Sequence, residues 1–233
     1  MDGTVYGANR NHPYPDAPNA YHLQQVTSGA FLQVPNAVNA SDVGYYAGLD
    51  EMQAEATMIG LPRGTVQLRP YRPHWANDYD SECQRLTQAG GRVDLRIAHV
   101  GSTAVPGLAA KPIIDIAIEV ATLADIQALV APFTELGYQY FGERHIKGDY
   151  FFAKGAEHCR THYVHVSLPD SHRFEHYLIF CDALRSDVAL REKYQQRKEM
   201  LAELHADDRR TYTEQKGELI ERVLAQFTNS TNQ

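Results

Sequence analysis

Long apolar runs, dense basic clusters and paired cysteines are all missing from this chain, and each absence excludes a class of protein. No stretch reaches the roughly 18 apolar residues of a membrane span, and the N-terminus lacks the pattern of a signal peptide. There is no dense run of Lys and Arg, and the formal net charge of −7 gives no general attraction to nucleic-acid backbones. We therefore expect a cytoplasmic protein that binds neither membrane nor nucleic acid.

Cysteine is equally scarce. Cys83, Cys159 and Cys181 are odd in number and show no paired metal-ligand spacing. Three reduced thiols in an intracellular protein are the simplest interpretation.

Lysine is absent from residues 1–64, which are rich in Asn, Pro, Gly, Ala and Tyr. This composition predicts a loop-rich N-terminal extension. One alternative is a mobile tail. The other is an arm that covers the active cleft or a neighbouring subunit of a homodimer, because its tyrosines and apolar residues are too many for a solvated tail. Residues 229–233 are predicted to form a disordered tail.

Residues 65–228 show the pattern of a single α/β (α+β) domain. Short β-rich runs predict strands over 66–71, 94–100, 112–120, 138–141, 149–154 and 161–168. Helical periodicity predicts helices over 75–90, 123–136, 174–184, 188–205 and 212–227, and the run 191–198 is predicted to be an exposed helix face. Early strands with helices flanking and following them predict a mixed sheet flanked by helices, with a helical C-terminal layer.

The most informative stretch is residues 97–116, with the sequence IAHVGSTAVPGLAAKPIIDI. Gly101 and Ser102 follow an apolar run, and such a turn leaves backbone N–H groups free to meet an anion. Asp115 interrupts a second apolar run, where an unpaired buried carboxylate would be costly. A bound metal is one suitable partner, and a metal beside an anion-binding turn indicates phosphate chemistry.

The same stretch resembles the signature of the GrpB-like family, which is placed among nucleotidyltransferases of the DNA polymerase beta type. The similarity extends over about residues 66–227. Residues 160–166 (RTHYVHV) resemble the family's His-containing strand, and residues 178–185 (LIFCDALR) resemble its helix start with two departures, Cys181 and Ala183. The Tyr and Lys spacing in 194–198 and 212–216 also fits the family.

The resemblance implies a nucleotidyltransferase-like fold and a small-molecule substrate. It implies nucleotidyl or phosphoryl transfer, with a nucleoside triphosphate and a divalent metal (Mg²⁺, Mn²⁺ or Zn²⁺) as cofactors. Gly101 and Ser102 would hold phosphates, and Asp115 would be a catalytic residue and metal ligand. The second carboxylate of the superfamily is replaced by Ala117, and Glu119 lies about 13 Å from Asp115 along an extended strand. We therefore expect weak or absent transfer with Mg²⁺ and ATP.

Two histidines compete for a role on the predicted strand 161–168. His162 and His165 are three apart, so they face opposite sides of a regular strand. The resemblance favours His165 as the site residue, where an imidazole beside a carboxylate could ligate a metal or act as a general acid or base. His99, just before the Gly-Ser turn, is a further catalytic candidate, with a purely structural role as the alternative.

Several hydroxyl and cationic side chains are candidates for binding substrate phosphates. Each has a structural alternative: a local cap for the threonine, a solvated loop or hairpin residue for most of the cations, and packing with a snorkelling side chain for the last lysine. Tyr212 and Lys216, four apart, would share one helix face. The candidates are Thr103, Lys111, Arg144, Arg160 and Lys216.

Two functions remain beside the leading one. The fold could carry acid–base chemistry without a nucleotide, such as cyclisation or hydrolysis by Asp115 and histidines. Alternatively, the domain could bind a ligand without turnover, with Ala117 marking the loss of transfer activity.

Overall fold

The computed structural model describes residues 59–144 and 147–230, which lie in the second of two compact units, 1–58 and 59–233. The predictions for residues 1–58 and 231–233 fall outside this part of the chain and stay predictions. Residues 59–64, which we assigned to the extension, belong to the second unit. Leu61 is buried and pairs with Arg160 in an isolated β-bridge.

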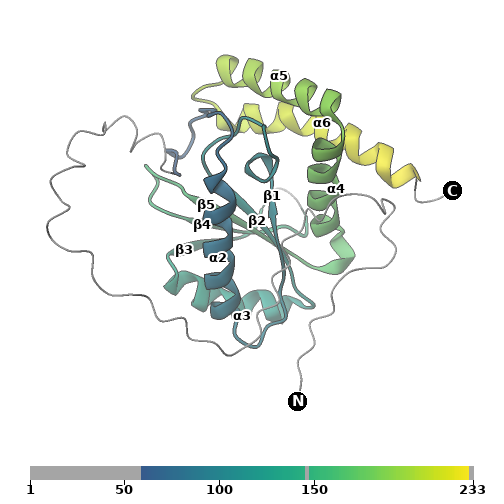
Figure 1. Ribbon diagram of the computed structural model, residues 1–233. Helices are drawn as coiled ribbons and strands as arrows, with labels where there is room; N and C mark the ends of the chain where they lie inside the picture. Colours follow the sequence, from purple (N-terminus) through teal and green to yellow (C-terminus); the bar gives the residue numbers. More distant parts are fainter. Residues whose placement is uncertain (1–58, 145–146, 231–233) are drawn as a thin grey trace, which may run out of the picture. The chain divides into compact units, whose positions relative to one another are not determined.

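A five-stranded mixed sheet forms the centre of this unit (Figure 1), in the order β1-β2-β5-β4-β3. Strands β2 and β5 are parallel, and the other neighbours are antiparallel. The strands are β1 Arg96–Val100, β2 Ile114–Glu119, β3 Tyr138–Glu143, β4 Tyr150–Lys154 and β5 His162–Ser167.

Helices cover both faces of the sheet. The long helices are α2 His74–Gly90, α3 Leu123–Glu135, α4 Arg173–Ser186, α5 Val188–Leu204 and α6 Arg209–Ser230, and the short 3-10 helices are η2 Ser102–Ala104 and η3 Pro169–Ser171. Helix α3 begins with a capping box between Thr122 and Asp125, which satisfies free N–H groups of its first turn.

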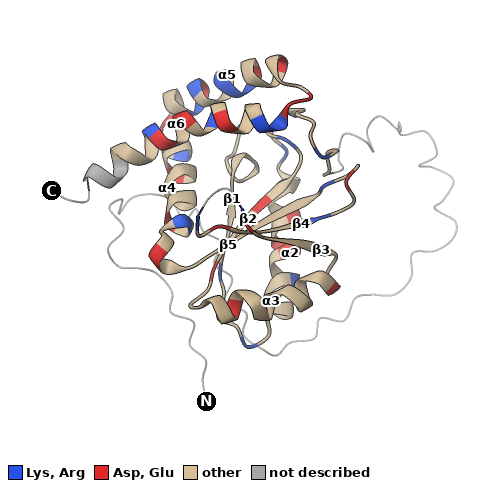
Figure 2. Cartoon of the chain, turned by 180° about the vertical axis from the view of Figure 1, so that it is seen from behind, with Lys and Arg blue, Asp and Glu red and all other residues tan. Residues whose placement is uncertain are grey.

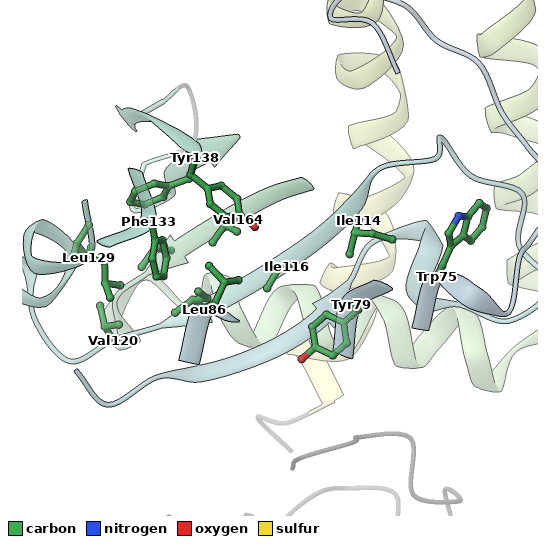
Figure 3. Packing of buried hydrophobic residues seen from close by; sticks show 14 of the residues in the cluster. Trp75, Tyr79, Leu86, Ile114, Ile116, Val120, Leu129, Phe133, Tyr138 and Val164 are labelled. Atoms are coloured by element: carbon green, nitrogen blue, oxygen red, sulfur yellow. The ribbon is translucent and has the colours of Figure 1, made fainter. Parts of the chain in front are cut away.

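The main hydrophobic core lies between one face of the sheet and helices α2 and α3 (Figure 3). Ile114, Ile116 and Ile118 point to this side from β2, because side chains alternate along a strand. They meet the predicted stripe of α2, whose Trp75 and Leu86 are fully buried. The β2 side chains on this face of the sheet are therefore all apolar.

The opposite face of the sheet is covered by α4, which packs in turn against α5 and α6 (Figure 1). Figure 2 shows that charged residues are numerous along these C-terminal helices. By alternation, Asp115 and Ala117 of β2 lie on this second face. The second core cluster includes Ala117, Phe180 and Tyr194.

The predicted mixed sheet, flanking helices and helical C-terminal layer are confirmed, and one predicted strand is wrong. Residues 66–71 form only a single bridge, between Arg69 and Ala110. Ala110 belongs to a loop and not to a strand of the sheet, so this bridge does not extend into a ladder of paired residues. Among the described residues, no helix is long and apolar enough to cross a membrane.

Candidate functional site

Gly101 and Asp115 are in direct contact at the junction of β1 and η2. Val100 pairs with Asp115 across the antiparallel β1–β2 ladder, and Gly101 follows at once with a positive φ of 72°. A Cβ atom on Gly101 would lie 2.7 Å from Oδ2 of Asp115. Both the left-handed backbone and the close approach therefore require glycine at this position.

Ser102, the next residue, meets two side chains from α5. The Nζ atom of Lys198 lies 3.1 Å from Oγ of Ser102, and the Tyr194 side chain is also hydrogen-bonded to Ser102. Lys198 also donates a hydrogen bond to the carbonyl oxygen of Ala109. Burial, followed by the nearby charge of Lys216, lowers the pKa of Lys198 to about 7.

The prediction that residues 191–198 form an exposed helix face is therefore wrong for Tyr194 and Lys198, which are both buried. Lys198 is only 1% exposed. Its stem lies beside Tyr194, with Nζ 5.0 Å from the centroid of that ring.

Further cations gather on the same side of the sheet. The Nζ atoms of Lys111 and Lys216 lie 5.6 and 5.9 Å from the ring centroid of Tyr212 on α6. Arg209 donates a hydrogen bond of 2.6 Å to the hydroxyl of Tyr163, which pairs with Asp115 across the β2–β5 ladder. Burial and then the charges of Arg209 and Lys216 hold the pKa of Lys111 well below its usual range, while Asp115 opposes this shift.

Lys111, Lys198, Arg209 and Lys216 thus form a cation cluster beside Ser102 and Asp115. Such a group of like charges is unfavourable when no anion is present, because each charge disfavours the charged form of the others. A polyanion such as a chain of phosphates would relieve this repulsion.

His165 belongs to a second hydrogen-bonded group on the same face. Its Nδ1 atom lies 2.9 Å from Oδ2 of Asp149, and the Tyr177 hydroxyl lies 3.3 Å from the same oxygen. Burial lowers the pKa of His165, but the Asp149 carboxylate outweighs it and raises that pKa above the ordinary value. Because Nδ1–H donates to Asp149, Nε2 is the nitrogen left for chemistry in the site.

The register of the sheet places this imidazole beside the position of the missing carboxylate. Ala117 and His165 are paired residues of the parallel β2–β5 ladder, and both lie on the face of Asp115. His162 lies on the opposite face and is buried, in agreement with the predicted alternation. Burial, before any nearby charge, lowers the pKa of His162 to about 4.

His99 and Thr103 lie away from this face. His99 pairs with Ile116, so it points toward α2, where its ring stacks on Tyr79 with centroids 4.7 Å apart. Its Nε2 atom lies 3.0 Å from Oγ1 of Thr103, which is buried. Burial lowers the pKa of His99 to about 3. The structure thus separates both residues from Asp115 and favours the structural alternative for each.

The two candidate arginines also differ in their surroundings. Arg160 is buried and donates to the carbonyl oxygen of Gly155 at 2.6 Å and to Oε1 of Gln139 at 3.2 Å, so it links neighbouring loops and strands. Arg144 is exposed and lies 4.6 Å over the ring of Phe151. Its charge reaches His165 and lowers the pKa of that histidine, which places Arg144 at the margin of the site.

The residues around Asp115 do not fit a metal ion. Asp115 is flanked by the cation cluster, and Asp149 is already bonded to His165 and Tyr177. Over residues 59–144 and 147–230, no group of three or more His, Cys, Asp or Glu side chains converges as a metal site would. The predicted metal ligands Asp115 and His165 are close in the fold, but their surroundings suit an anion.

Five residues of this arrangement were not among our candidates. A sequence signal existed for two of them: Tyr194 and Lys198 repeat on α5 the spacing of Tyr212 and Lys216 on α6, and in each pair the ammonium group lies over the ring. The others carry no local pattern, because they reach the site from separate elements. The five are Asp149, Tyr177, Tyr194, Lys198 and Arg209.

Comparison with known proteins identifies the family. Residues 65–226 match the family model described as GrpB protein. The chain belongs to the GrpB family. A UPF0157 protein of Pseudomonas aeruginosa is 39% identical over 169 residues, covering 71% of this chain and 69% of that protein.

A solved structure agrees with this GrpB assignment. A crystal structure of the conserved protein GrpB from Enterococcus faecalis has a TM-score of 0.63 and 31% identity, covering 69% of this chain and 99% of that one. The Cid1 poly(U) polymerase with MgGTP bound is a distant structural neighbour, with a TM-score of 0.43 and 10% identity over 57% of this chain and 44% of that one. Nothing about activity follows from a likeness at that level.

Proposed function

We propose that this chain is a small-molecule enzyme of the nucleotidyl- or phosphoryl-transfer class. Its cation cluster would hold the phosphates of the substrate, and His165 would move a proton. One observation carries the proposal: Lys111, Lys198 and Lys216 come together with Ser102 on the Asp115 face of the sheet. Several basic side chains gathered around a Gly-Ser turn are the arrangement expected of a polyphosphate site.

In this proposal the charges of Lys111, Arg209 and Lys216 neutralise the phosphates directly. Their charge replaces that of a metal, for which the donor set is unsuited. Asp115 favours the charged form of Lys111 and would orient an acceptor hydroxyl. Nε2 of His165 would remove the proton of that hydroxyl, while Asp149 and Tyr177 fix the ring.

The Asp149–His165–Tyr177 group supports a second candidate function. A histidine oriented by a carboxylate also suits acid–base chemistry without a nucleotide, such as hydrolysis or cyclisation. Product formation that depends on ATP would favour the first function. Turnover without a nucleotide would favour the second.

Calorimetric titration with inorganic pyrophosphate and with ATP, each with Mg²⁺ or with a chelator, tests the proposal. We expect both anions to bind in the presence of the chelator and to bind more weakly at high salt. Lys216→Met should weaken binding roughly tenfold, as loss of a charge-assisted hydrogen bond does. Lys193→Met, an exposed position on α5, is the matched control and should change little. Absence of binding, or binding only with Mg²⁺, would overturn the proposal.

A further inference from the structure

Ser102 and Lys198 form a pair that phosphate binding alone does not require. A serine that only binds phosphate needs no buried amine 3.1 Å from its Oγ atom. Ser102 is partly exposed, whereas Lys198 is almost fully buried on α5. The Ser102 hydroxyl is therefore accessible to a substrate, while the Lys198 amine that contacts it is shielded from water.

The hydrogen bonds around this pair are suited to removing the serine proton. As an ammonium group, Lys198 donates to Ser102 and to the Ala109 carbonyl. As a neutral amine, it keeps a hydrogen for Ala109 and offers its lone pair to the Ser102 hydroxyl. Tyr194 has its pKa raised by burial, so its hydroxyl stays protonated and can donate to Oγ of Ser102. The proton of Ser102 is then directed at Lys198.

We propose that Ser102 is a nucleophile activated by Lys198, and that it takes a phosphoryl or nucleotidyl group from a phosphate anhydride or ester to form a covalent intermediate. This inference rests on the proposed function and adds a two-step route to it. A lysine acting as the base for a serine is an established variant of nucleophilic catalysis.

The proposed transfer takes two steps. In the first, Oγ of Ser102 forms a bond to phosphorus, its proton moves to the neutral Nζ of Lys198, and the bond from phosphorus to the leaving oxygen breaks with its electron pair. In the second, an acceptor hydroxyl gives its proton to Nε2 of His165 and attacks phosphorus. The Oγ–phosphorus bond breaks, and Oγ recovers the proton from Lys198.

Reaction of the full chain with diisopropyl fluorophosphate, followed by intact and peptide mass spectrometry, tests this pair. The reagent is uncharged, so labelling does not depend on the anion binding that tests the proposed function. Oγ of Ser102 would displace fluoride from phosphorus, and Lys198 would take the proton. We expect one adduct on Ser102, with a rate that rises with pH and levels off above about pH 7, where Lys198 becomes neutral.

Three variants complete the test. Ser102→Ala should abolish the adduct, and Lys198→Met should slow it at least roughly a hundredfold, a typical contribution of a general base. Lys193→Met, the same change at an exposed position of the same helix, should react at the wild-type rate. If Lys198→Met fails to fold, the pH dependence of the wild-type labelling rate tests the inference without that variant. An unlabelled Ser102, equal rates in both lysine variants, or a rate that still rises at about pH 10 would overturn the inference.

Discussion

At the scale of single residues, Gly101 links backbone conformation to the position of Asp115. Its positive φ and the space taken by the carboxylate are separate constraints. Gly107 provides the matched comparison, because it has a similar φ of 79° but nothing within 4 Å of an added Cβ.

Gly101→Ala should therefore destabilise the protein more than Gly107→Ala does. Backbone strain alone should cost about 1 kcal/mol at each position. The clash with Asp115 should add about 1–3 kcal/mol at Gly101, as overpacking does elsewhere. Urea unfolding of both variants measures the difference. Equal losses would show that Asp115 moves aside freely.

The Asp149–His165 pair makes stability depend on pH in a defined direction. Asp149 has a pKa below its ordinary 3.8, so its contribution is present above that value and is lost as pH falls through the lowered pKa. His165 has a pKa above its ordinary 6.5, so its contribution is present below that value and is lost as pH rises through the raised pKa. Both contributions coexist between about pH 4 and 6.5.

Asp149→Asn should thus lower the free energy of unfolding most within that window. We expect a loss of about 1–3 kcal/mol near pH 5.5 and a smaller one near pH 9, because the contribution of His165 is lost as pH rises through its raised pKa. Denaturant unfolding at the two pH values gives the comparison, with Asp170→Asn on the exposed η3 as control. A loss that is the same at both values would contradict the charged pair.

At the scale of elements, helix α6 places Lys216 close to two other basic side chains, Lys111 and Lys198. Lys216 lowers the pKa of both Lys111 and Lys198. In the proposed function its presence would favour anion binding at a cost in stability, a trade-off common at functional sites.

Lys216→Met should accordingly stabilise the free protein while it weakens pyrophosphate binding. The gain should be about 0.5–1 kcal/mol at low ionic strength and should fade at high salt, because exposed charges are screened. Urea unfolding at both salt levels measures it. A destabilised variant would show that packing of the lysine stem on Tyr212 outweighs charge repulsion.

The elements also show which parts of the site could be predicted from sequence. The Gly-Ser turn and Asp115 lie within one local motif, and strand alternation was enough to separate His165 from His162. The contact of Lys198 with Ser102 joins residues 96 positions apart, and no local periodicity encodes it. The candidate His99 lies apart from Asp115 because the one-residue step from Val100 turns its side chain to the other face of the sheet.

At the scale of the whole molecule, the described unit has a core on each face of its sheet. The proposed arm, residues 1–64, lies almost wholly outside the described residues and stays a prediction. If it docks on the domain or across a dimer, limited proteolysis should spare most of it, and its deletion should expose apolar surface or change the oligomeric state. Size-exclusion chromatography and dye binding measure both effects. Rapid trimming to about Gly64 without loss of stability would show it to be a tail.

The distance in sequence between Ser102 and α5 has a consequence for biosynthesis. The ribosome completes the Gly-Ser turn and Asp115 long before it reaches Lys198 and Lys216, which belong to the last helices of the chain. A nascent chain that ends before α5 holds the conspicuous motif but lacks the lysines that α5 and α6 supply. If the chain binds a polyanion as proposed, binding requires the C-terminal helices to dock first, and a premature stop in this region would remove it even where the sheet and its first core have formed.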